Sequence, residues 1–335
     1  MPSIPPLRYL AGADVIAAMP APDERLALAE LTLRGLAGDA EMPPKIGVHP
    51  RPDGAFGHAM PAYLPGDDAT GAGDLVGMKW VMGYPTNTAL GLPGIHGTLL
   101  LSDPVTGVPV ALMDASPITA ERTAAISGVA IRAWAPLVVG RPSRAAVIGA
   151  GVQGTSHVAM IGYVLPGATL VVFDRDPARA EALAAHARDT AGIGGAATAR
   201  TAREAVEGAD VVVTAASFVA PPGRQVMTGD WLGPETLVVP VDYATYCSAE
   251  VARDAALFVV DHREQFLVNR DAGQFDGYPD PAAMMGEVLP TTAGAARPRG
   301  RIVASHLGTG LADVVFGSAI LAAATRLGLG TELPR

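Results

Sequence analysis

A lysine stands in a segment that otherwise has the composition of a protein interior. Lys79 lies in "GMKWVMGYPTN", residues 77–87, and it is one of only two lysines among 24 basic residues, the other being Lys45. Such a lysine either extends its alkyl stem until the ammonium reaches solvent or acts as a cation inside a pocket. Because arginine supplies nearly all the other positive charge, the retained lysine favours a need for a compact ammonium.

An arginine is expected close to the start of a helix. The segment "SPITAERTAAISGVAIRAWAP" predicts a helix that begins near Ser116 or Thr119 and places Arg122 in its first turn. A guanidinium is unfavourable beside the positive end of a helix dipole unless an anion is near. Arg122 is therefore a candidate carboxylate-binding residue with bidentate geometry available. A solvated arginine, or one paired with Glu121 or Asp114, is the alternative.

Asp242 ends the apolar run "TLVVPVD". In open α/β sheets ligands bind at the carboxyl ends of the strands, where this carboxylate could exchange a proton with a substrate nitrogen. An Asx turn or a cap for the helix in "YATYCSAEVARDA" is the competing interpretation, although Ser248 is the better cap.

A glycine-rich turn indicates a dinucleotide. Gly149, Gly151 and Gly154 form G-x-G-x-x-G in "AAVIGAGVQG", between a strand and a helix, where backbone N–H groups can meet a pyrophosphate. Twenty residues further on, Asp174 ends the next strand and can accept hydrogen bonds from the adenosine ribose, which favours NAD. Arg175 could instead bind a 2′-phosphate, so NADP stays open.

The elements that must position these residues differ between the two parts of the chain. Residues 11–37 predict two short helices interrupted by Pro20 and Pro22, and residues 41–115 predict an antiparallel sheet in which "GTLLLSDPVTGVPVALMD" is a hairpin. From residue 144 apolar strands alternate with helices, which predicts a parallel sheet covered on both faces. The last stretch, from "LADVVFGSAILAAATRLGLG" onward, is a helix and a tail that could belong to either part.

Composition limits the classes of function. The chain has 335 residues, roughly two domains, and a net charge of −9 that gives no basic surface for nucleic acid. The single cysteine, Cys247, excludes an intramolecular disulfide framework and is expected to fill core space. We expect neither a signal peptide nor a membrane span, and therefore a cytoplasmic protein. The seven histidines have no i, i+4 pair, so no metal site is expected.

Several of these motifs together resemble one family. The succession "GMKWVMGYPTN", "GLPGIHGTLLLSDPVTGVPVALMD", "ITAERTAA", "VIGAGVQG" and "VVPVDYATY" is similar to the ornithine cyclodeaminase and mu-crystallin family, in the family's order, from about Pro43 to Asp313. The resemblance implies an α/β homodimer in which residues 1–125 with 314–335 form an α+β substrate-binding and dimerisation domain. Residues 126–313 would form a Rossmann-type NAD(P)-binding domain, with the active site between the domains.

The resemblance also implies roles for single residues. Lys79 would contact the substrate, Arg122 and Lys45 would bind its carboxylate, and Asp242 would exchange a proton with its nitrogen. "HLGTGLADVV" would be a late loop near the nicotinamide, although a glycine-rich turn with Asp313 opening a helix explains it almost as well. The residues expected to contact the cofactor are Thr123, Gly149, Gly151, Val152, Gln153, Gly154, Asp174, Arg175, Ala215, Ala216, His306 and Gly308.

Departures from the family pattern narrow the expected reaction. His58, in "GHAMPAY", stands where cyclodeaminases have a glutamate near the substrate's amines, and "DYATY" departs from their D-x-P-G-K pattern. An imidazole is a poor partner for ornithine's ammonium. We therefore expect hydride transfer at the α-carbon of an amino or imino acid, by an imino-acid or ketimine reductase or an amino-acid dehydrogenase. An ornithine or lysine cyclodeaminase, and a non-catalytic protein that binds NAD(P) and a ligand, are the alternatives.

Overall fold

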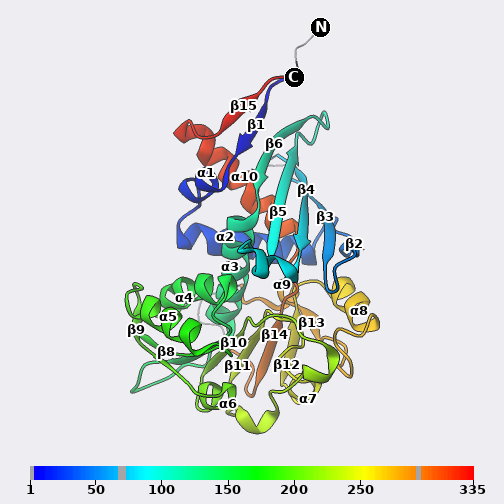
Figure 1. Ribbon diagram of the computed structural model, residues 1–335. Helices are drawn as coiled ribbons and strands as arrows, with labels where there is room; N and C mark the ends of the chain where they lie inside the picture. The colour runs from blue at the N-terminus through cyan, green and yellow to red at the C-terminus, as the bar shows by residue number, and fades with distance from the viewer. Residues whose placement is uncertain (1–3, 67–72, 292–295) are drawn as a thin grey trace. The chain divides into compact units, whose positions relative to one another are not determined.

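The chain divides into two compact units. The computed structural model describes residues 4–66, 73–291 and 296–335 (Figure 1). One unit comprises Met1–Arg122 with Gly308–Arg335, and the other comprises Thr123–Leu307. The sequence placed these boundaries after residues 125 and 313. The difference matters because Gly308 and Asp313 belong to the first unit.

A mixed sheet forms the first unit. Its strand order is β15-β1-β6-β5-β4-β3-β2, and all neighbours are antiparallel except β1 and β6. The strands are β1 (Leu7–Leu10), β2 (Ile46–Val48), β3 (Phe56–Leu64), β4 (Leu75–Gly83), β5 (Ile95–Ser102), β6 (Pro109–Asp114) and β15 (Thr331–Leu333). The predicted hairpin is β5–β6, and Gly107 in its turn has φ +72°. The terminal strands β1 and β15, which pair with each other, were not foreseen.

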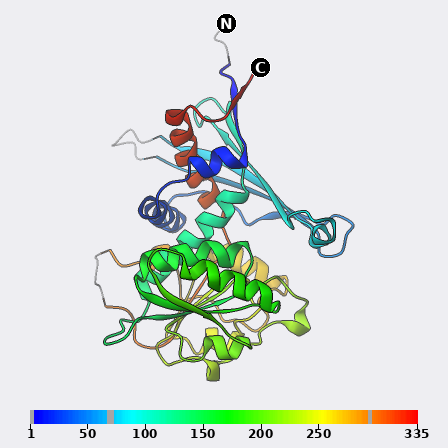
Figure 2. The same ribbon diagram turned by 60° about the vertical axis from the view of Figure 1, so that its left-hand side comes forward.

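Helices pack on one face of this sheet. Helices α1 (Gly12–Ala17) and α2 (Pro22–Ala37) confirm the predicted break at the prolines, and α10 (Gly310–Leu327) contacts α2, β3, β4 and β5. Figure 2 shows α1 and α2 in blue beside α10 in red. By length and composition α10 could cross a membrane, which we did not expect, but more than half of it, including every residue from Gly310 to Gly317, is buried inside the unit. The helix thus completes the first unit's core.

A parallel sheet forms the second unit and confirms the predicted α/β class. Its order is β13-β12-β14-β11-β10-β7-β8-β9. The strands are β7 (Arg144–Ile148), β8 (Ala168–Phe173), β9 (Ile193–Thr198), β10 (Val211–Thr214), β11 (Leu237–Pro240), β12 (Leu257–Val260), β13 (Ala283–Met284) and β14 (Ile302–Ser305). The helices are α3 (Ser116–Trp134, entering from the first unit), α4 (Val152–Val164), α5 (Pro177–Arg188), α6 (Ala202–Val206), α7 (Ala249–Arg253), α8 (Arg263–Asp271) and α9 (Met285–Val288).

The strand order fixes where a ligand can bind. The chain leaves β7 for β8 and β9 on one side and later returns to β10 on the other, so the topological switch point lies between β7 and β10. Gly149, Ala215, Asp242 and His306 follow the carboxyl ends of β7, β10, β11 and β14, respectively. Cys247 is buried in the core of this unit, as expected.

Candidate active site

A buried cluster of two cations and one carboxylate lies in the first unit. The Nζ atom of Lys79 is 2.6 Å from Oδ2 of Asp313, and Nε of Arg122 is 3.1 Å from its Oδ1. Lys79 is 1% exposed, Arg122 4% and Asp313 0%. Nζ of Lys79 also donates to Oγ1 of Thr119 at 3.2 Å. The surface explanation for the lysine, an ammonium extended to solvent, is therefore wrong.

Three elements bring this cluster together. Lys79 is at the centre of β4, paired with Met60 of β3 and Leu99 of β5, and its face of the sheet receives α10. Asp313 lies in the first turn of α10, which Thr309 caps by accepting from the N–H of Ala312. A carboxylate is favourable there because the helix dipole is positive at that end. Sequence reasoning noticed Asp313 only as a helix-opening acid and missed its partners.

The environment of Arg122 differs from the one predicted. Helix α3 begins at Ser116, so Arg122 lies in its second turn and the helix-dipole argument for an anion does not apply. The expected alternative partners are also occupied elsewhere, because Glu121 pairs with Arg25 and Asp114 accepts from the backbone N–H of Ser116. The anion beside Arg122 is Asp313.

The chain closes tightly around the Arg122 guanidinium. Gly308 has φ +77°, and a Cβ there would lie 2.7 Å from Nη1 of Arg122. Gly308, expected as a cofactor contact, is therefore a glycine that makes room for the arginine in the first unit. A side chain at this position would displace the guanidinium.

Burial perturbs the protonation of Lys79. Desolvation, against the opposing effect of Asp313 and with the help of Arg122 and Lys45, lowers its pKa to about 7. An ammonium with this pKa exchanges its proton near neutral pH. An added carboxylate would raise the pKa again by stabilising the charged form, so anion binding and protonation of Lys79 are coupled.

The other expected substrate residues also belong to the first unit. His58 lies on β3 and stacks on Phe56 with ring centroids 4.7 Å apart. Burial first, and then Lys45, His49 and Lys79, lower the pKa of His58 to about 4. All the charged neighbours that shift it are basic. His49 was not singled out from the sequence, which offers no pattern that links it to His58.

Asp242 is a buried carboxyl in the second unit. Its Oδ1 accepts from Oγ1 of Thr214 at 2.6 Å, its Oδ2 accepts from the N–H of Ala216 at 3.2 Å, and the residue is 1% exposed. Burial raises its pKa to about 7, against the opposing effect of these hydrogen bonds. Ser248, not Asp242, caps α7, because its Oγ accepts from the N–H of Val251. A carboxyl with a pKa near 7 can give or take a proton at neutral pH.

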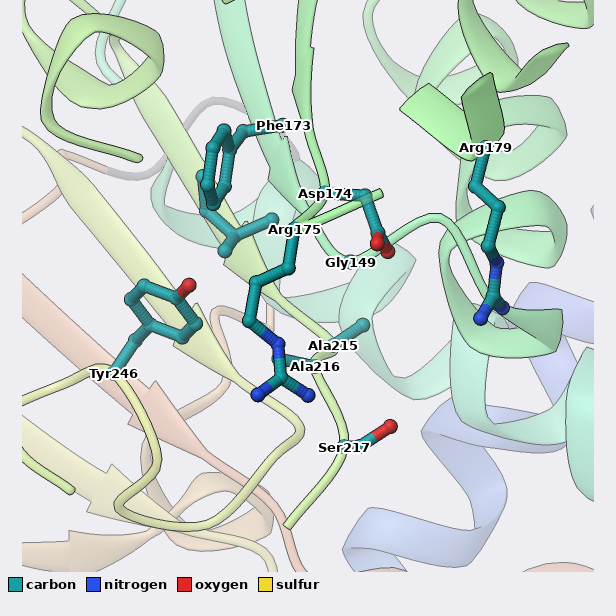
Figure 3. A pocket seen from close by; sticks show the side chains of 11 residues that line it. Gly149, Phe173, Asp174, Arg175, Arg179, Ala215, Ala216, Ser217 and Tyr246 are labelled. Carbon is teal, nitrogen blue, oxygen red and sulfur yellow. The ribbon is translucent and has the colours of Figure 1, made fainter. Parts of the chain in front are cut away.

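A pocket opens at the switch point of the second unit, beside Asp242's partner Ala216 (Figure 3). Its lining residues are Ile148, Gly149, Gly151, Phe173, Asp174, Arg175, Arg179, Ala215, Ala216, Ser217 and Tyr246. Six of these were expected as cofactor contacts, and the structure adds five that were not: Ile148, Phe173, Arg179, Ser217 and Tyr246. Thr123, Val152, Gln153, Gly154 and His306 do not line this pocket.

The glycines of the G-x-G-x-x-G turn beside this pocket fit a dinucleotide. Gly149 has φ +105°, and a Cβ on it would lie 2.5 Å from the carbonyl oxygen of Ala215. A Cβ on Gly154 would lie 2.0 Å from the carbonyl oxygen of Gly149, so α4 approaches β7 closely. At Gly151 a Cβ would meet only Arg179, at 3.6 Å, which leaves the backbone open to a pyrophosphate. Each glycine thus has the role that the fingerprint requires.

Charged side chains of both signs line the end of this pocket where the adenosine of a dinucleotide is expected. Asp174 accepts from the N–H of Ala150 at 2.7 Å and of Asp176 at 2.9 Å, one bond to each oxygen. Each oxygen retains a lone pair for a ribose hydroxyl. Figure 3 shows Arg175 and Arg179 at the same pocket, and neither forms an ion pair with a carboxylate in the described parts of the chain. Ribose and phosphate recognition are both chemically available.

A hydroxyl bridges two buried histidines in the second unit. Oγ of Ser127 is 2.7 Å from Nε2 of His157 and 2.8 Å from Nε2 of His306, and Nδ1 of His157 is 2.6 Å from the carbonyl oxygen of Gln153. Nδ1 of His157 must donate to that carbonyl, so its Nε2 accepts from Ser127, which accepts in turn from His306. Burial lowers the pKa of His157 to about 4, which keeps it neutral. Ser127 and His157 were missed because the residues are far apart in sequence.

Within the described residues no group of three or more His, Cys, Asp or Glu side chains is arranged to hold a metal ion.

Comparison with known proteins identifies the family of the chain. The sequence model of the ornithine cyclodeaminase/mu-crystallin family matches residues 15–320. The chain belongs to the ornithine cyclodeaminase/mu-crystallin family. This confirms the resemblance seen in the motifs.

Relatives within the family cover almost the whole chain. The nodulation efficiency protein NfeD of Rhizobium meliloti is 37% identical over 333 residues, 98% of each protein. The Δ1-pyrroline-2-carboxylate reductase of Thermococcus litoralis, solved with NADH and L-proline, superposes with a TM-score of 0.83 at 26% identity, over 98% of this chain and 100% of that one. An archaeal alanine dehydrogenase dimer with bound NAD gives 0.79 at 26% identity, over 98% of both chains. Structural relatives in this family thus bind NAD(H).

Proposed function

We propose that the protein is an NAD(P)-dependent oxidoreductase that transfers hydride at the α-carbon of an amino or imino carboxylate. Within this class it would be an imino-acid or ketimine reductase or an amino-acid dehydrogenase. The observation that carries the proposal is the buried pair of cations, Lys79 and Arg122, which share one carboxylate in a chain that also has a fitting dinucleotide pocket.

The first unit supplies carboxylate binding. Lys79 and Arg122 with Asp313 carry a net charge of +1, from two cations and one anion. Burial of two like charges is costly, and a second carboxylate would reduce that cost by charge-assisted hydrogen bonds. Lys79, whose pKa is about 7, would be more fully protonated once the substrate's carboxylate is bound, because that anion stabilises the ammonium. This role suits an α-carboxylate.

The second unit supplies proton transfer and cofactor binding. A bound nicotinamide cofactor provides or accepts the hydride at the α-carbon. In the reductive direction the new C–H bond forms as the C=N π electrons move to nitrogen, and the carboxyl of Asp242 gives that nitrogen its proton, directly or through water. The hydrogen bonds from Thr214 and Ala216 hold the carboxyl of Asp242 in place before and after it gives up its proton. The imine is reduced to an amine and the cofactor is oxidised, so electrons balance.

NAD is the cofactor we propose, because Asp174 closes the adenosine end of the pocket with free lone pairs for a ribose. The guanidinium groups of Arg175 and Arg179 favour NADP as the alternative. Lys79, Arg122 and basic neighbours make ornithine, with its second ammonium, a poor substrate, which argues against cyclodeamination.

A homodimer is the proposed assembly. The residues directly before and after Lys79 on β4 face away from α10, and this face of the sheet carries exposed apolar side chains, with Trp80 38% and Tyr9 39% exposed. Other side chains on this face are Met78, Met82, Leu100 and Leu112. A second copy is the occupant we propose, since the archaeal alanine dehydrogenase is a dimer. Trp80→Glu should then yield monomers in light scattering, whereas an unchanged mass would contradict this interface.

The enzymatic proposal is tested by NADH and NADPH oxidation against cyclic imines and against 2-oxo acids mixed with ammonium or methylamine. We expect turnover with at least one imine, and a loss of about 100-fold or more in kcat for Asp242→Asn with little change in cofactor affinity. Arg122→Met should raise KM strongly, and Arg132→Met, an exposed arginine on the same helix, is the matched control. Absence of turnover with every imine, despite cofactor binding, would contradict the proposal and favour a binding protein.

A further inference from the structure

In the described parts of the chain, two residues other than glycine have a left-handed backbone. Gln225 has φ +60° and Tyr243 has φ +58°. This region is unfavourable for residues that carry a Cβ, and residues held in it tend to lie at functional sites. Both residues belong to the loops that surround Asp242 in the second unit.

Tyr243 occupies the second position of a tight turn that begins at Asp242. The N–H of Thr245 donates to the carbonyl oxygen of Asp242 at 3.1 Å and closes the turn. The backbone N–H of Tyr246 then donates to the Asp242 carboxyl, as does the N–H of Ala216 at 3.2 Å. Ala216 and Tyr246 both line the dinucleotide pocket (Figure 3). The backbone conformation of Tyr243 therefore determines where the carboxyl lies relative to this pocket.

Gln225 holds the same turn from outside. Its N–H donates to the carbonyl oxygens of Ala244, at 3.0 Å, and Thr245, at 3.1 Å. Its side chain is also held, because Nε2 donates to the carbonyl oxygen of Asp276 and Oε1 accepts from the N–H of Ala249, both at 2.8 Å. Gln225 thus ties the turn to two neighbouring segments.

Aromatic rings hold Tyr243 from two sides. The centroid of its ring is 4.9 Å from that of Phe218 and 5.5 Å from that of Phe275. Phe275 is 0% exposed and packs on Phe266 and Tyr278, so this side of the stack is anchored in the core. Aromatic pairs at such distances stabilise a fold beyond the area that they bury. The stack therefore offsets the cost of the left-handed backbone at Tyr243.

We propose that Tyr243 is a positioning residue for Asp242, because its stacked ring holds the left-handed turn that fixes the carboxyl. The inference rests on the proposed function, in which Asp242 gives a proton to the substrate nitrogen. Without the ring, a residue with a Cβ would leave the left-handed region, the turn would open, and water would reach the carboxyl. Glycine adopts this backbone at little cost, so the turn would largely persist with glycine even though the ring is lost.

Two variants at one position separate the turn from ordinary packing. Tyr243→Ala and Tyr243→Gly both remove the ring, but only alanine bears the cost of the left-handed conformation. A ring that merely fills space predicts equal properties for the two variants, whereas a ring that holds the turn predicts that glycine rescues what alanine loses. Tyr163→Ala removes a tyrosine that is 47% exposed on α4 of the same unit, and it is the control.

Titration of the Asp242 carboxyl tests the inference without turnover. Its carboxyl carbon resonance, identified by its absence from Asp242→Asn, is followed against pH. The wild-type midpoint should lie near 7, since burial raises the pKa of Asp242 to about this value. In Tyr243→Ala the midpoint should fall towards the ordinary value of an aspartate because the carboxyl is hydrated, and in Tyr243→Gly it should stay closer to wild type. Equal midpoints in the two variants, or a wild-type midpoint at the ordinary value, would overturn the inference.

Kinetics with the imine that gives the highest turnover provides the second measurement. We expect kcat to be about tenfold lower in Tyr243→Ala than in Tyr243→Gly, because the left-handed conformation disfavours alanine by about that factor. KM and the affinity for NADH should change little, and Tyr163→Ala should match wild type. Equal kcat values in the two Tyr243 variants, or an effect confined to KM, would overturn the inference. If no imine is reduced, the proposed function fails and the titration alone decides the role of Tyr243.

A third variant keeps the test decisive if Tyr243→Ala does not fold. Phe218 is 57% exposed, so Phe218→Ala removes one ring of the stack without opening the core. The midpoint of Asp242 and kcat should both fall, by less than in Tyr243→Ala. No change in either quantity would overturn the claim that the stack holds the turn.

Discussion

Replacing Asp313 by asparagine removes the carboxylate that two buried cations share. Lys79 and Arg122 would remain at 1% and 4% exposure without the anion that lies 2.6 Å and 3.1 Å from them. Truncating one partner of a buried ion pair costs about 3–5 kcal/mol, because the other charge is left uncompensated. The free energy of unfolding should fall by about this amount at pH 6.

The loss should depend on pH because only one of the cations can discharge. Asp313 raises the pKa of Lys79, which is about 7 in the native protein, so below pH 7 the lysine is charged and the ion pair contributes. Above that value the lysine is neutral with or without Asp313, and only Arg122 is left unpaired. The loss at pH 9 should therefore be smaller than at pH 6 by at most about 1.4 kcal/mol, the value of one pKa unit, because pH 6 lies one unit below the pKa of Lys79.

Urea denaturation followed by circular dichroism at pH 6 and pH 9 measures both quantities. Glu332→Gln, which breaks the exposed Arg8–Glu332 pair in the same unit, is the matched control and should cost about 1 kcal/mol or less. The double variant Lys79→Met/Asp313→Asn should recover part of the loss at pH 6. A loss below about 1 kcal/mol for Asp313→Asn, or equal losses at both pH values, would refute the reasoning.

Three further outcomes are expected. Because the pKa of Asp242 is raised to about 7, the native state keeps a proton that the unfolded state releases near the ordinary pKa of an aspartate, and the stability of the wild-type protein falls as pH rises between these two values. Asp242→Asn should remove this pH dependence of stability in urea titrations, and an unchanged pH dependence would contradict the raised pKa of Asp242. Gly149→Ala, at φ +105° and with a carbonyl oxygen 2.5 Å from the new Cβ, should weaken NADH binding at least tenfold in fluorescence titrations, with native-like affinity as the contrary result. Ser127→Ala should shift the imidazole nitrogen resonances of His157 and His306, and Ser127→Thr should restore them; unperturbed spectra would show that the hydroxyl does not bridge the rings.

Structural features that are determined by residues close together in the sequence could be predicted from the sequence. The G-x-G-x-x-G turn fixes a strand, a tight turn and a helix within a few residues, so the geometry of Gly149 and Gly154 followed from spacing alone. The proline break between α1 and α2 and the β5–β6 hairpin did so for the same reason. Weak strands such as β9, with four glycines and alanines in "IGGAAT", form because a neighbouring strand, here β8, supplies hydrogen bonds, and periodicity does not reveal them.

Long-range pairings were beyond sequence reasoning. Asp313 is 191 residues from Arg122, and an acid in the first turn of a helix is ordinary by itself. The pairing of Lys79 with Asp313 could therefore be recognised only in the structure, where α10 packs against β4. The same holds for His49 and His58, which converge over a glycine of an edge strand. Helix α3 begins at Ser116, one of the two predicted positions, so the placement of Arg122 in the first turn, which assumed a start near Thr119, was wrong.

Transfer of deuterium tests the central claim most directly. The protein is incubated with NADH deuterated at C4 of the nicotinamide, in the transferable position, together with the imine that gives the highest turnover, and the amino acid product is analysed by mass spectrometry and NMR. The account predicts one deuterium, located at the α-carbon, with the nitrogen-bound protons exchanged from solvent. A product with no deuterium at the α-carbon would contradict hydride transfer at that atom.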